Sequence, residues 1–545
     1  MDDTIESQPE GHPNRHMIAH TPILKRFLIA LSLSNLLFWQ GWVRLLDERQ
    51  VYFDPAWATH GLVVLVTLTV GFALLFVLGV TVAGASRRPV WLSIADWAFL
   101  LVVLYAVVRM GTAVSREAGR YWLISWFVTA VVLSLALPVA FLRWRTRIRQ
   151  ILVTGLLIAF PFVLVTFGRT FFELFLGNDR FRDRSTAKLV SSRAEIPRVV
   201  WIVFDELDNS VAFTNRPPGL MLPEFDRLRQ ESLFASNALP PADSTSMSLP
   251  ALLCGKPVAA ARFREDEMLI QFAGTETWVP WSGEQNVFTR ARRLGVNSAL
   301  VGWYHPYCRV IAGTLNACVW DGSPYEEIFQ AAPYRQFYRF AAGEIRDVLG
   351  RSTTESLSHQ VPLFRDQHSF LAEHAKKLVA DRSYGLVFVH FSIPHPPAIY
   401  DVRQGMRATG QPGYLDNLET ADRTLGELRR AMEDAGTWDK SVLLITSDHW
   451  WRPSIWRNTA LWTDEDEALF SAGRLDNTVP FILRLPGQSK PVHYEERFAT
   501  VIASDLLTAI LKGEVNDLKA AATWIAAANS KVDQTIYTEA AGIQP

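Results

Sequence analysis

The chain has 545 residues, of which 49% are apolar and 20% charged, and its formal net charge is −1. This length exceeds a typical domain of about 100–200 residues, and the charged fraction lies below the roughly 25% of ordinary soluble proteins. Residues 1–174 carry 15 Lys and Arg against 10 Asp and Glu, which leaves 39 against 45 for residues 175–545. The composition excludes a disordered chain, and because no basic stripe is present we expect no nucleic-acid partner.

Five long apolar runs fill the first third of the chain. They cover residues 27–46, 60–85, 90–110, 121–142 and 150–171. Each run is close to the ~20 residues that a helix needs to cross the hydrocarbon core of a bilayer. A buried soluble bundle is the alternative, but the runs lack a polar stripe at helical spacing. We therefore predict a transmembrane domain of five helices over residues 27–175.

Lys and Arg mark one side of these runs. They are Lys25, Arg26, Arg87, Arg88, Arg143, Arg145, Arg147 and Arg149. By the positive-inside rule, residues 1–26 are a cytoplasmic N-terminus. Five spans then place everything after about residue 175 outside. We predict a multi-pass inner-membrane protein with a periplasmic domain, whose first helix is an uncleaved anchor because the polar N-terminus lacks a cleavage signal.

After a mixed-charge linker at 176–197, short apolar runs alternate with helical patterns. The runs cover residues 199–204, 298–302, 385–391, 441–446 and 480–484. Buried strands that alternate with helices, such as the one expected at 417–435, are typical of α/β domains. Residues 198–545 are therefore predicted to form an α/β domain with a mostly parallel sheet.

Acidic and imidazole side chains follow four of these expected strands. They are Asp205, Glu206, His305, His395, Asp448 and His449. The carboxyl ends of parallel strands meet at one edge of the sheet, so these groups are expected in one site. A single Asp after a strand often only caps the next helix, but the combination predicts a divalent metal site. Carboxylate and imidazole ligands suit Zn²⁺ first, with Mn²⁺, Mg²⁺ and Ca²⁺ as alternatives.

A nucleophile is sought among the hydroxyl groups of the segment PPADSTSMSLPALLCGKP. It contains Ser244, Thr245, Ser246 and Ser248 before an apolar helical turn, whose N-terminal amides favour an anion. Such a cluster alone is more often a helix cap than a catalyst.

The three cysteines suit an exported domain. Cys308 and Cys318 are close enough in sequence to close a short loop in an oxidising compartment, whereas the apolar neighbours of Cys254 indicate a buried thiol.

Several motifs together resemble the sulfatase-like branch of the alkaline phosphatase superfamily over residues 198–512. They are VFDE ending at 206, TSMSLPALLCG at 245–255, GWYH at 302–305, HFSIPHPP at 390–397 and ITSDHW at 445–450. Their order and spacing agree with the acidic strand end, the C-x-P-S-R-x-x-L-L-x-G segment, G-K-W-H, H-x-P and S-D-H-G of sulfatases.

The resemblance places Thr245 where sulfatases have the Cys that becomes formylglycine, and T-x-x-S-x-P also matches phosphoethanolamine transferases. Five spans and a Thr nucleophile are similar to those transferases and to lipoteichoic acid synthases. The resemblance implies that Thr245 attacks and that Asp205, Thr245, Asp448 and His449 hold the metal. Glu206 takes the place of the second acidic ligand of sulfatases, although transferases usually show one. His305 and His395 are implied to bind the substrate anion.

Two departures from the family pattern bring aromatic rings to the expected site. Trp303 replaces the Lys of G-K-W-H, and Trp450 follows His449 where a Gly is expected. These rings either bind a lipid or sugar or block the pocket.

Three functions remain open from the sequence. The first is a metal-dependent transferase that moves a phospho-headgroup from a membrane lipid, through a covalent Thr245 intermediate, to an envelope glycan or lipid. The second is a hydrolase of phosphate, phosphonate or sulfate esters that uses the same residues. The third is a non-catalytic membrane-anchored binding protein. The oligomeric state stays open.

Overall fold

The computed structural model describes most of the chain. The described residues are 22–46, 52–53, 55–86, 88–118, 120–176, 183–190, 196–264, 266–321, 338, 341–342, 345, 354–403, 411–488, 490–531 and 536. Most of the predicted cytoplasmic N-terminus 1–26 and about half of the predicted linker 176–197 lie outside them. The chain forms two compact units: unit 1 comprises Met1–Asp47, Ala56–Asn178 and Ala332–Arg351, and unit 2 comprises Glu48–Pro55, Asp179–Ala331 and Ser352–Pro545.

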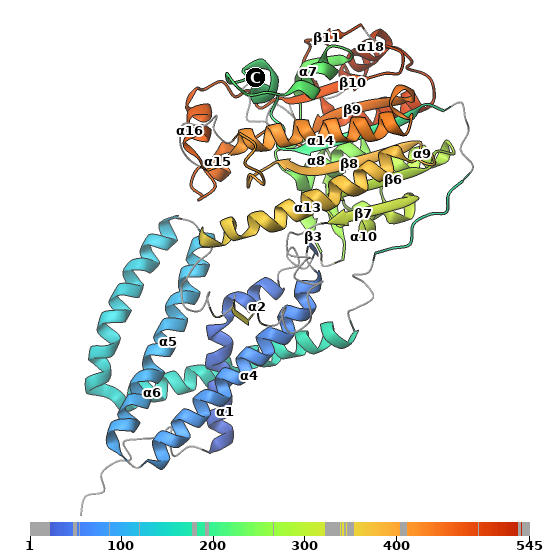
Figure 1. Ribbon diagram of the computed structural model, residues 1–545. Coiled ribbons are helices and arrows are strands. Elements are labelled where there is room, and N and C mark those ends of the chain that lie inside the picture. The colour runs from blue at the N-terminus through green and yellow to red at the C-terminus, as the bar shows by residue number, and fades with distance from the viewer. Residues whose placement is uncertain are drawn as a thin grey trace, which may run out of the picture. The chain divides into compact units, whose positions relative to one another are not determined.

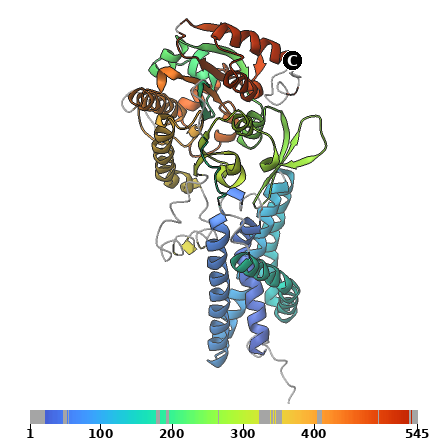
Figure 2. The ribbon, with the colours of Figure 1, turned by 90° about the vertical axis from the view of Figure 1, so that its right-hand side faces the viewer.

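The N-terminal part of the chain is helical (Figures 1 and 2). Its helices are α1 (Ile23–Leu37), α2 (Trp39–Leu46), α4 (Pro55–Ala85), α5 (Pro89–Ala118) and α6 (Arg120–Leu176). Three stretches within the described residues are long and apolar enough to cross a membrane, namely Gly61–Ala85, Pro89–Thr112 and Ile124–Phe172. The chain thus carries apolar helices of membrane-spanning length, while the count of five spans stays a prediction.

Two features explain why five predicted runs yield only three stretches of spanning length among the described residues. The first run is divided at Phe38 into α1 and α2, and neither piece reaches spanning length. The fourth and fifth runs both lie in α6, where the backbone leaves helical geometry at Trp144 (φ −122°, ψ 34°). Figure 1 shows that α6 changes direction along its length. Trp144 lies among the four arginines at 143–149, which the sequence predicts to form a loop.

Polar contacts inside unit 1 join its helices. Asn35 of α1 donates a hydrogen bond to Thr166 of α6 (2.8 Å), and both side chains are buried. Asp96 of α5 pairs with Arg145 (2.8 Å) and with the fully buried Arg149 (3.3 Å), both on α6. A buried charge is tolerated when it is paired, so these contacts fix how α5 and α6 pack.

Unit 2 is built on a nine-stranded sheet. Its strands are β1 (Arg198–Asp205), β2 (Leu233–Leu239), β6 (Ser298–Trp303), β7 (Ala317–Asp321), β8 (Leu386–Pro394), β9 (Ser441–Ser447), β10 (Val479–Arg484), β11 (Val492–Tyr494) and β12 (Phe498–Ala499). Their order is β11-β2-β10-β9-β1-β8-β6-β7, with β12 beside β2. Only β10 runs antiparallel to its neighbours in this sheet. The prediction of an α/β domain with a mostly parallel sheet is confirmed.

Helices cover both faces of this sheet (Figure 1). In β1, Val199, Trp201 and Val203 face one core and the alternate residues face the other, which explains the continuous apolar run. The first core is completed by α8 (Thr245–Cys254), α9 (Val287–Arg293), α17 (Ala503–Leu511) and α18 (Leu518–Asn529). The second is completed by α7 (Pro223–Arg229), α13 (Thr354–Ala380) and α14 (Tyr414–Asp434).

Smaller elements complete unit 2. A three-stranded antiparallel sheet is formed by β3 (Val258–Phe263), β4 (Met268–Phe272) and β5 (Trp278–Pro280). Short helices are η2 (Ser210–Thr214), η3 (Trp281–Gly283), α10 (Tyr307–Val310), η4 (Ala312–Thr314), η5 (Trp438–Lys440), α15 (Pro453–Trp456), α16 (Asp464–Ser471) and η6 (Thr500–Ile502). The central strand β1 lies between β9 and β8, so three parallel strands end at the same edge of the sheet.

Candidate active site

The ends of β1 and β9 bring two carboxylates to this edge. Asp205 is the last residue of β1, and Asp448 follows β9, whose Ser447 pairs with Phe204. The Ser447 hydroxyl donates to the Phe204 carbonyl (2.6 Å) and accepts from the Leu207 amide (2.9 Å). The two strand ends are therefore tied together just where the acidic side chains begin.

Thr245 reaches these carboxylates from the first turn of α8. Ser244 precedes the helix in an extended conformation (φ −145°, ψ 142°), so that Thr245 is the first helical residue. Its hydroxyl donates to Asp205 Oδ2 (3.3 Å) and lies 3.1 Å from His449 Nε2. The amides of a helix N-terminus lack partners within the helix and attract anions. The hydroxyl thus stands where an anionic substrate group is favoured.

The ring of His449 is held in one tautomer. Its Nδ1 lies 3.1 Å from the Trp450 carbonyl, which only accepts, so Nδ1 carries the hydrogen and the Nε2 lone pair is free. That lone pair faces Asp448 Oδ2 (3.3 Å) and Asp205 Oδ1 (3.6 Å). These electron-rich atoms therefore face one another.

The residues present fit a divalent metal ion. Asp205 Oδ1 and Asp448 Oδ2 are buried and accept no hydrogen bond from the residues that the structure describes. Burial raises the pKa of the Asp205 carboxyl well above its usual range, and the carboxylates of Asp448 and Glu206 raise it further. A cation would take up the orphaned oxygens and offset this repulsion. Two overlapping groups of three residues could hold the ion, and within each group the ligand atoms lie within 4.8 Å of one another. The groups are Asp205, Glu206 and His449, and Asp205, His390 and Asp448.

His390 is a site residue that the sequence analysis missed. It lies on β8 opposite Val203 of β1 and is fully buried. Its Nδ1 is 3.0 Å from the Tyr307 hydroxyl, whereas its buried Nε2 has no hydrogen-bond partner. The signal was present, because His390 is the single imidazole in the apolar stretch LVFVHF. It belongs to the strand itself rather than to the loop after it.

Glu206 lies beside the cluster but is already engaged. It has a left-handed backbone (φ 61°), which is uncommon for a residue other than Gly and concentrates at functional sites. Its Oε1 accepts from Arg452 (2.9 Å), and its Oε2 accepts from the Trp456 indole (3.1 Å). Arg452 also attracts Asp205 and Asp448. The sequence analysis missed this arginine, which follows the S-D-H segment by three positions.

The two predicted anion-binding histidines occupy different surroundings. His305 is fully buried, with Nε2 3.4 Å from the Thr245 carbonyl, and burial lowers its pKa to about 3. His395 is partly exposed, and its ring lies between Trp303 (5.4 Å) and Trp456 (4.9 Å). His305 therefore supports the nucleophile segment as a neutral ring, while His395 stands beside the Glu206 side of the site.

The tryptophans that depart from the family pattern differ in exposure. Trp303 is only 6% exposed and packs against the histidine rings, whereas Trp450 is half-buried. A third tryptophan, Trp451, follows Trp450 in the sequence, is stacked on Tyr414 (4.5 Å) and is part of the core. Trp450 is thus the member of the three with side-chain surface open to a ligand.

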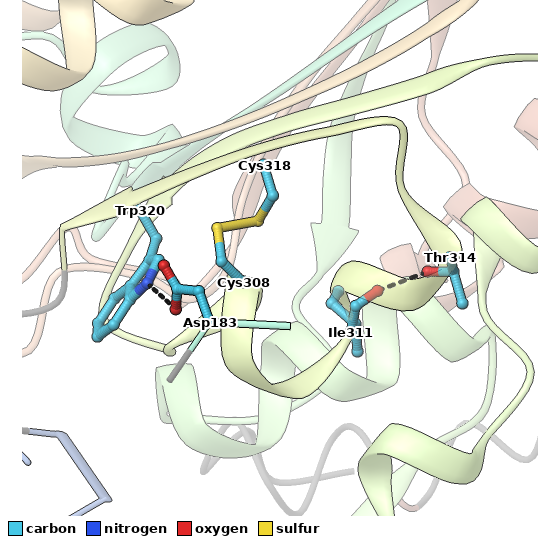
Figure 3. The surroundings of a disulfide bond; sticks show 6 residues. All are labelled: Asp183, Cys308, Ile311, Thr314, Cys318 and Trp320. Atoms are coloured by element: carbon cyan, nitrogen blue, oxygen red, sulfur yellow. Dashed lines mark hydrogen bonds between the residues drawn. A yellow bond between two sulfur atoms is a disulfide. The ribbon is translucent and has the colours of Figure 1, made fainter. Parts of the chain in front are cut away.

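Cys308 and Cys318 are joined in a disulfide with a Cα–Cα distance of 5.5 Å (Figure 3). The bridge connects α10 to β7, and beside it the Trp320 indole donates to Asp183 (3.0 Å). Cys254 is free and buried. The disulfide holds the segment that follows His305 against the sheet.

A parallel sheet that gathers carboxylates, imidazoles and a threonine hydroxyl around a cation-binding cluster defines a metal-dependent enzyme that acts on phosphate-ester or sulfate-ester types of bond. A family model described as Sulfatase matches residues 197–512, more than half of the chain. The chain belongs to the sulfatase family. The resemblance seen in the sequence is confirmed at this level.

Several solved structures are similar to the chain at low sequence identity. The phosphonate monoester hydrolase of Agrobacterium radiobacter is 14% identical, with 58% of this chain and 74% of that chain covered and a TM-score of 0.39. The PsFucS1 sulfatase from Pseudoalteromonas sp. is 14% identical, with 59% and 68% covered and a TM-score of 0.41. Ps i-CgsB in complex with k-i-k-neocarrahexaose is 16% identical, with 60% and 74% covered and a TM-score of 0.40. No curated protein matches the sequence.

Proposed function

We propose that the chain is a membrane-anchored, metal-dependent transferase that moves a phospho-headgroup from a membrane phospholipid to an envelope glycan or lipid. The observation that carries this proposal is the place of the Thr245 hydroxyl, which lies 3.1 Å from His449 Nε2 and 3.3 Å from Asp205 Oδ2 at the start of α8. A threonine cannot be converted to formylglycine, so the hydrated aldehyde of sulfatases has no precursor here. The hydroxyl itself is left as the nucleophile.

The proposed transfer reaction has two steps. In the first, Thr245 Oγ1 forms a bond to phosphorus, the phosphorus–oxygen bond to the lipid alcohol breaks, and that alcohol leaves with the proton that Thr245 gives up. The hydroxyl proton of Thr245 departs along its hydrogen bond to Asp205 Oδ2. In the second step a hydroxyl of the acceptor attacks the phosphothreonine, and the Thr245 oxygen regains a proton. Over both steps, the donor loses its phospho-headgroup and gains a proton, and the acceptor gains the phospho-headgroup and loses a proton.

Asp205, Thr245, Asp448 and His449 would hold the metal, with Glu206 and His390 next to them. A bound divalent ion, zinc before manganese, magnesium or calcium, supplies a lowered hydroxyl pKa and neutralises the transferred anion. The amides that open α8 orient the substrate oxygens toward Thr245. His305 and His395 are assigned to the substrate anion, with Trp303 and Trp450 beside it.

A lipid donor is supported by the apolar helices of the same chain. Helices of membrane-spanning length keep the enzyme at a lipid surface, which raises the local concentration of a phospholipid headgroup. We propose that the N-terminus is cytoplasmic and that unit 2 faces the periplasm, as the positions of the basic residues indicate. This topology provides envelope glycans and lipids as acceptors.

Hydrolysis of phosphate, phosphonate or sulfate esters is the second candidate. The match to the sulfatase family favours it, because water would then take the place of the acceptor with the same residues in the same roles. The two candidates differ only in the fate of the group held by Thr245.

The test uses the full chain in detergent micelles with fluorescent phosphatidylethanolamine, followed by intact-mass measurement. We expect a phosphoethanolamine adduct on Thr245 and release of diacylglycerol. Thr245→Ala removes the adduct and lowers turnover by about 10³-fold or more, Thr245→Ser retains both, and Ser246→Ala is the matched control. Full activity in Thr245→Ala, or no adduct with any phospholipid, would overturn the proposal. Free phosphoethanolamine as the sole headgroup product would establish the hydrolase.

A further inference from the structure

Two aromatic residues far from the site in sequence are packed against it in unit 2. Tyr52 and Phe53 come from the segment Glu48–Pro55, which lies between the first two predicted membrane runs but belongs to unit 2. Tyr52 is fully buried, and its ring contacts Phe263 (5.0 Å). Phe53 contacts the ring of Tyr304 (4.7 Å). These contacts place Tyr52 and Phe53 beside the end of β6.

The backbone carbonyl of Tyr52 is held by Arg309. The arginine is 1% exposed, donates to the Tyr52 carbonyl, and holds its guanidinium 5.3 Å from the centre of the Tyr52 ring. A desolvated cation over an aromatic face is a favourable contact. Arg309 lies next to Cys308, whose disulfide to Cys318 restrains α10. Tyr52 therefore has little freedom to move.

The Tyr52 hydroxyl reaches the catalytic region through His305. It lies 3.3 Å from His305 Nδ1, while His305 Nε2 lies 3.4 Å from the Thr245 carbonyl. Because a carbonyl only accepts, Nε2 carries the hydrogen, and Nδ1 must then accept from the Tyr52 hydroxyl. Burial raises the pKa of Tyr52 well above its usual value, so the hydroxyl keeps its hydrogen. One consistent pattern of donors runs from Tyr52 to the nucleophile segment.

We propose that Tyr52 is a positioning residue of the active site, which fixes the orientation and the tautomer of His305 so that Nε2–H points at the Thr245 segment. The inference rests on the proposed function for the role of His305 toward the substrate anion. Part of the active site then comes from the segment between the first two predicted membrane runs, and residues 198–545 do not by themselves contain the complete site.

Without the Tyr52 hydroxyl, no hydrogen bond to Nδ1 favours the His305 tautomer that carries its hydrogen on Nε2. In Tyr52→Phe, Nδ1 has no donor, and the ring is free to carry its hydrogen there. Nε2 would then present a lone pair both to the Thr245 carbonyl and to any substrate oxygen, and both contacts become repulsive. Since the change deletes a single atom and keeps the aromatic contacts with Phe263 and Arg309, the fold is retained.

The experiment compares Tyr52→Phe with Tyr494→Phe in the full chain. Tyr494 is the matched control, because its hydroxyl pairs with Glu496 (3.2 Å) on β11 at the far edge of the sheet. We expect Tyr52→Phe to lower kcat/KM for diacylglycerol release by about tenfold, the value of one buried hydrogen bond, and Tyr494→Phe to leave it unchanged. In the background of His305→Gln, Tyr52→Phe should cause no further loss, because its effect passes through that ring.

A measurement that requires no enzymatic turnover tests the role of Tyr52 independently of the proposed function. In protein labelled with ¹⁵N-histidine, the signal missing from His305→Gln identifies His305, and its shifts report the protonated Nε2 in the unmodified chain. Tyr52→Phe should change that pattern even if no ester is found to be a substrate. Unchanged ¹⁵N shifts in Tyr52→Phe, or an equal loss of kcat/KM with and without His305, would overturn the role of Tyr52.

Discussion

The carboxylates of Asp205 and Asp448 should make the metal-free protein less stable than a variant with one charge removed. Their facing oxygens lie within 4.8 Å of one another and are fully buried. At that separation two unit charges repel by about 3.5 kcal/mol with an effective dielectric of about 20. Asp448→Asn should therefore stabilise the metal-free chain by up to about 3.5 kcal/mol at pH 7.5, which corresponds to several degrees in Tm.

Added metal should reduce this advantage of the variant. At 100 times Kd, a bound ion stabilises the folded state by about 2.7 kcal/mol. If the loss of one ligand weakens metal binding by about 10–100-fold, this gain falls to roughly 0.4–1.4 kcal/mol at the same metal concentration. Asp448→Asn should thus unfold at a higher temperature than the parent without metal and show a much smaller shift with Zn²⁺.

The assay is thermal unfolding of the detergent-solubilised chain after chelation and during titration with Zn²⁺, Mn²⁺, Mg²⁺ and Ca²⁺. Asp439→Asn is the matched control, because Asp439 precedes β9 at its opposite end and its side chain is 92% exposed. A lower Tm for metal-free Asp448→Asn together with an unchanged metal shift would refute the reasoning. The ion that produces the largest shift in the parent identifies the preferred metal.

Two further predictions concern other buried ionisable groups of unit 2. Arg452→Met should destabilise the chain by about 3–5 kcal/mol in chemical denaturation, because it leaves the buried Glu206 carboxylate without its partner. Adding Glu206→Gln to this variant should restore part of the lost stability. Equal losses in the single and double variants would contradict the pairing. Burial lowers the pKa of His368 to about 4, so its neutral form contributes stability above pH 6.5 that is lost as the pH falls through 4, about 2 kcal/mol of it between pH 7 and pH 5. His368→Asn should flatten the dependence of Tm on pH in this range, whereas His374→Asn, on the same helix, should leave that dependence unchanged. Parallel profiles of Tm against pH for the parent and His368→Asn would contradict the role of His368.

The sheet was predictable because its strands are buried on both faces. Runs such as 199–204 and 441–446 contain almost only apolar residues, and a continuous apolar run of that length is typical of a parallel strand. The run at 480–484 carries the same signal but forms β10, which is antiparallel to β9 and β2. Strand direction depends on the connections between strands, which hydrophobicity does not encode.

The site was predictable where its residues follow strands and unpredictable where they do not. Asp205, Asp448 and His449 stand at strand ends, and topology alone brings them together. His390 lies within β8, where an isolated histidine is more often a satisfied core residue. Arg452 and Tyr52 act on side chains distant in sequence, and only the three-dimensional contacts reveal those partners.

The apolar helices of unit 1 show a similar limit. Apolar length predicts that a segment can span, but it does not report where the backbone bends. The fourth and fifth runs are continuous in α6 apart from the kink at Trp144, and the residues around it are arginines that keep helical geometry on both sides. Arginine has good helix propensity, so a cluster of basic residues marks a membrane boundary without requiring a loop.

The choice between transfer and hydrolysis falls on the second step of the proposed reaction. In the proposed reaction, a group held on Thr245 would persist until a second nucleophile attacks it. Thr245 is only 5% exposed, and Asp205 and His449 are fully buried. Limited access lowers the rate at which water reaches the intermediate, whereas an acceptor bound by its own contacts arrives oriented. Burial of the threonine therefore favours an acceptor that carries binding groups over water, and it places the determinants of specificity on surfaces such as the half-buried Trp450.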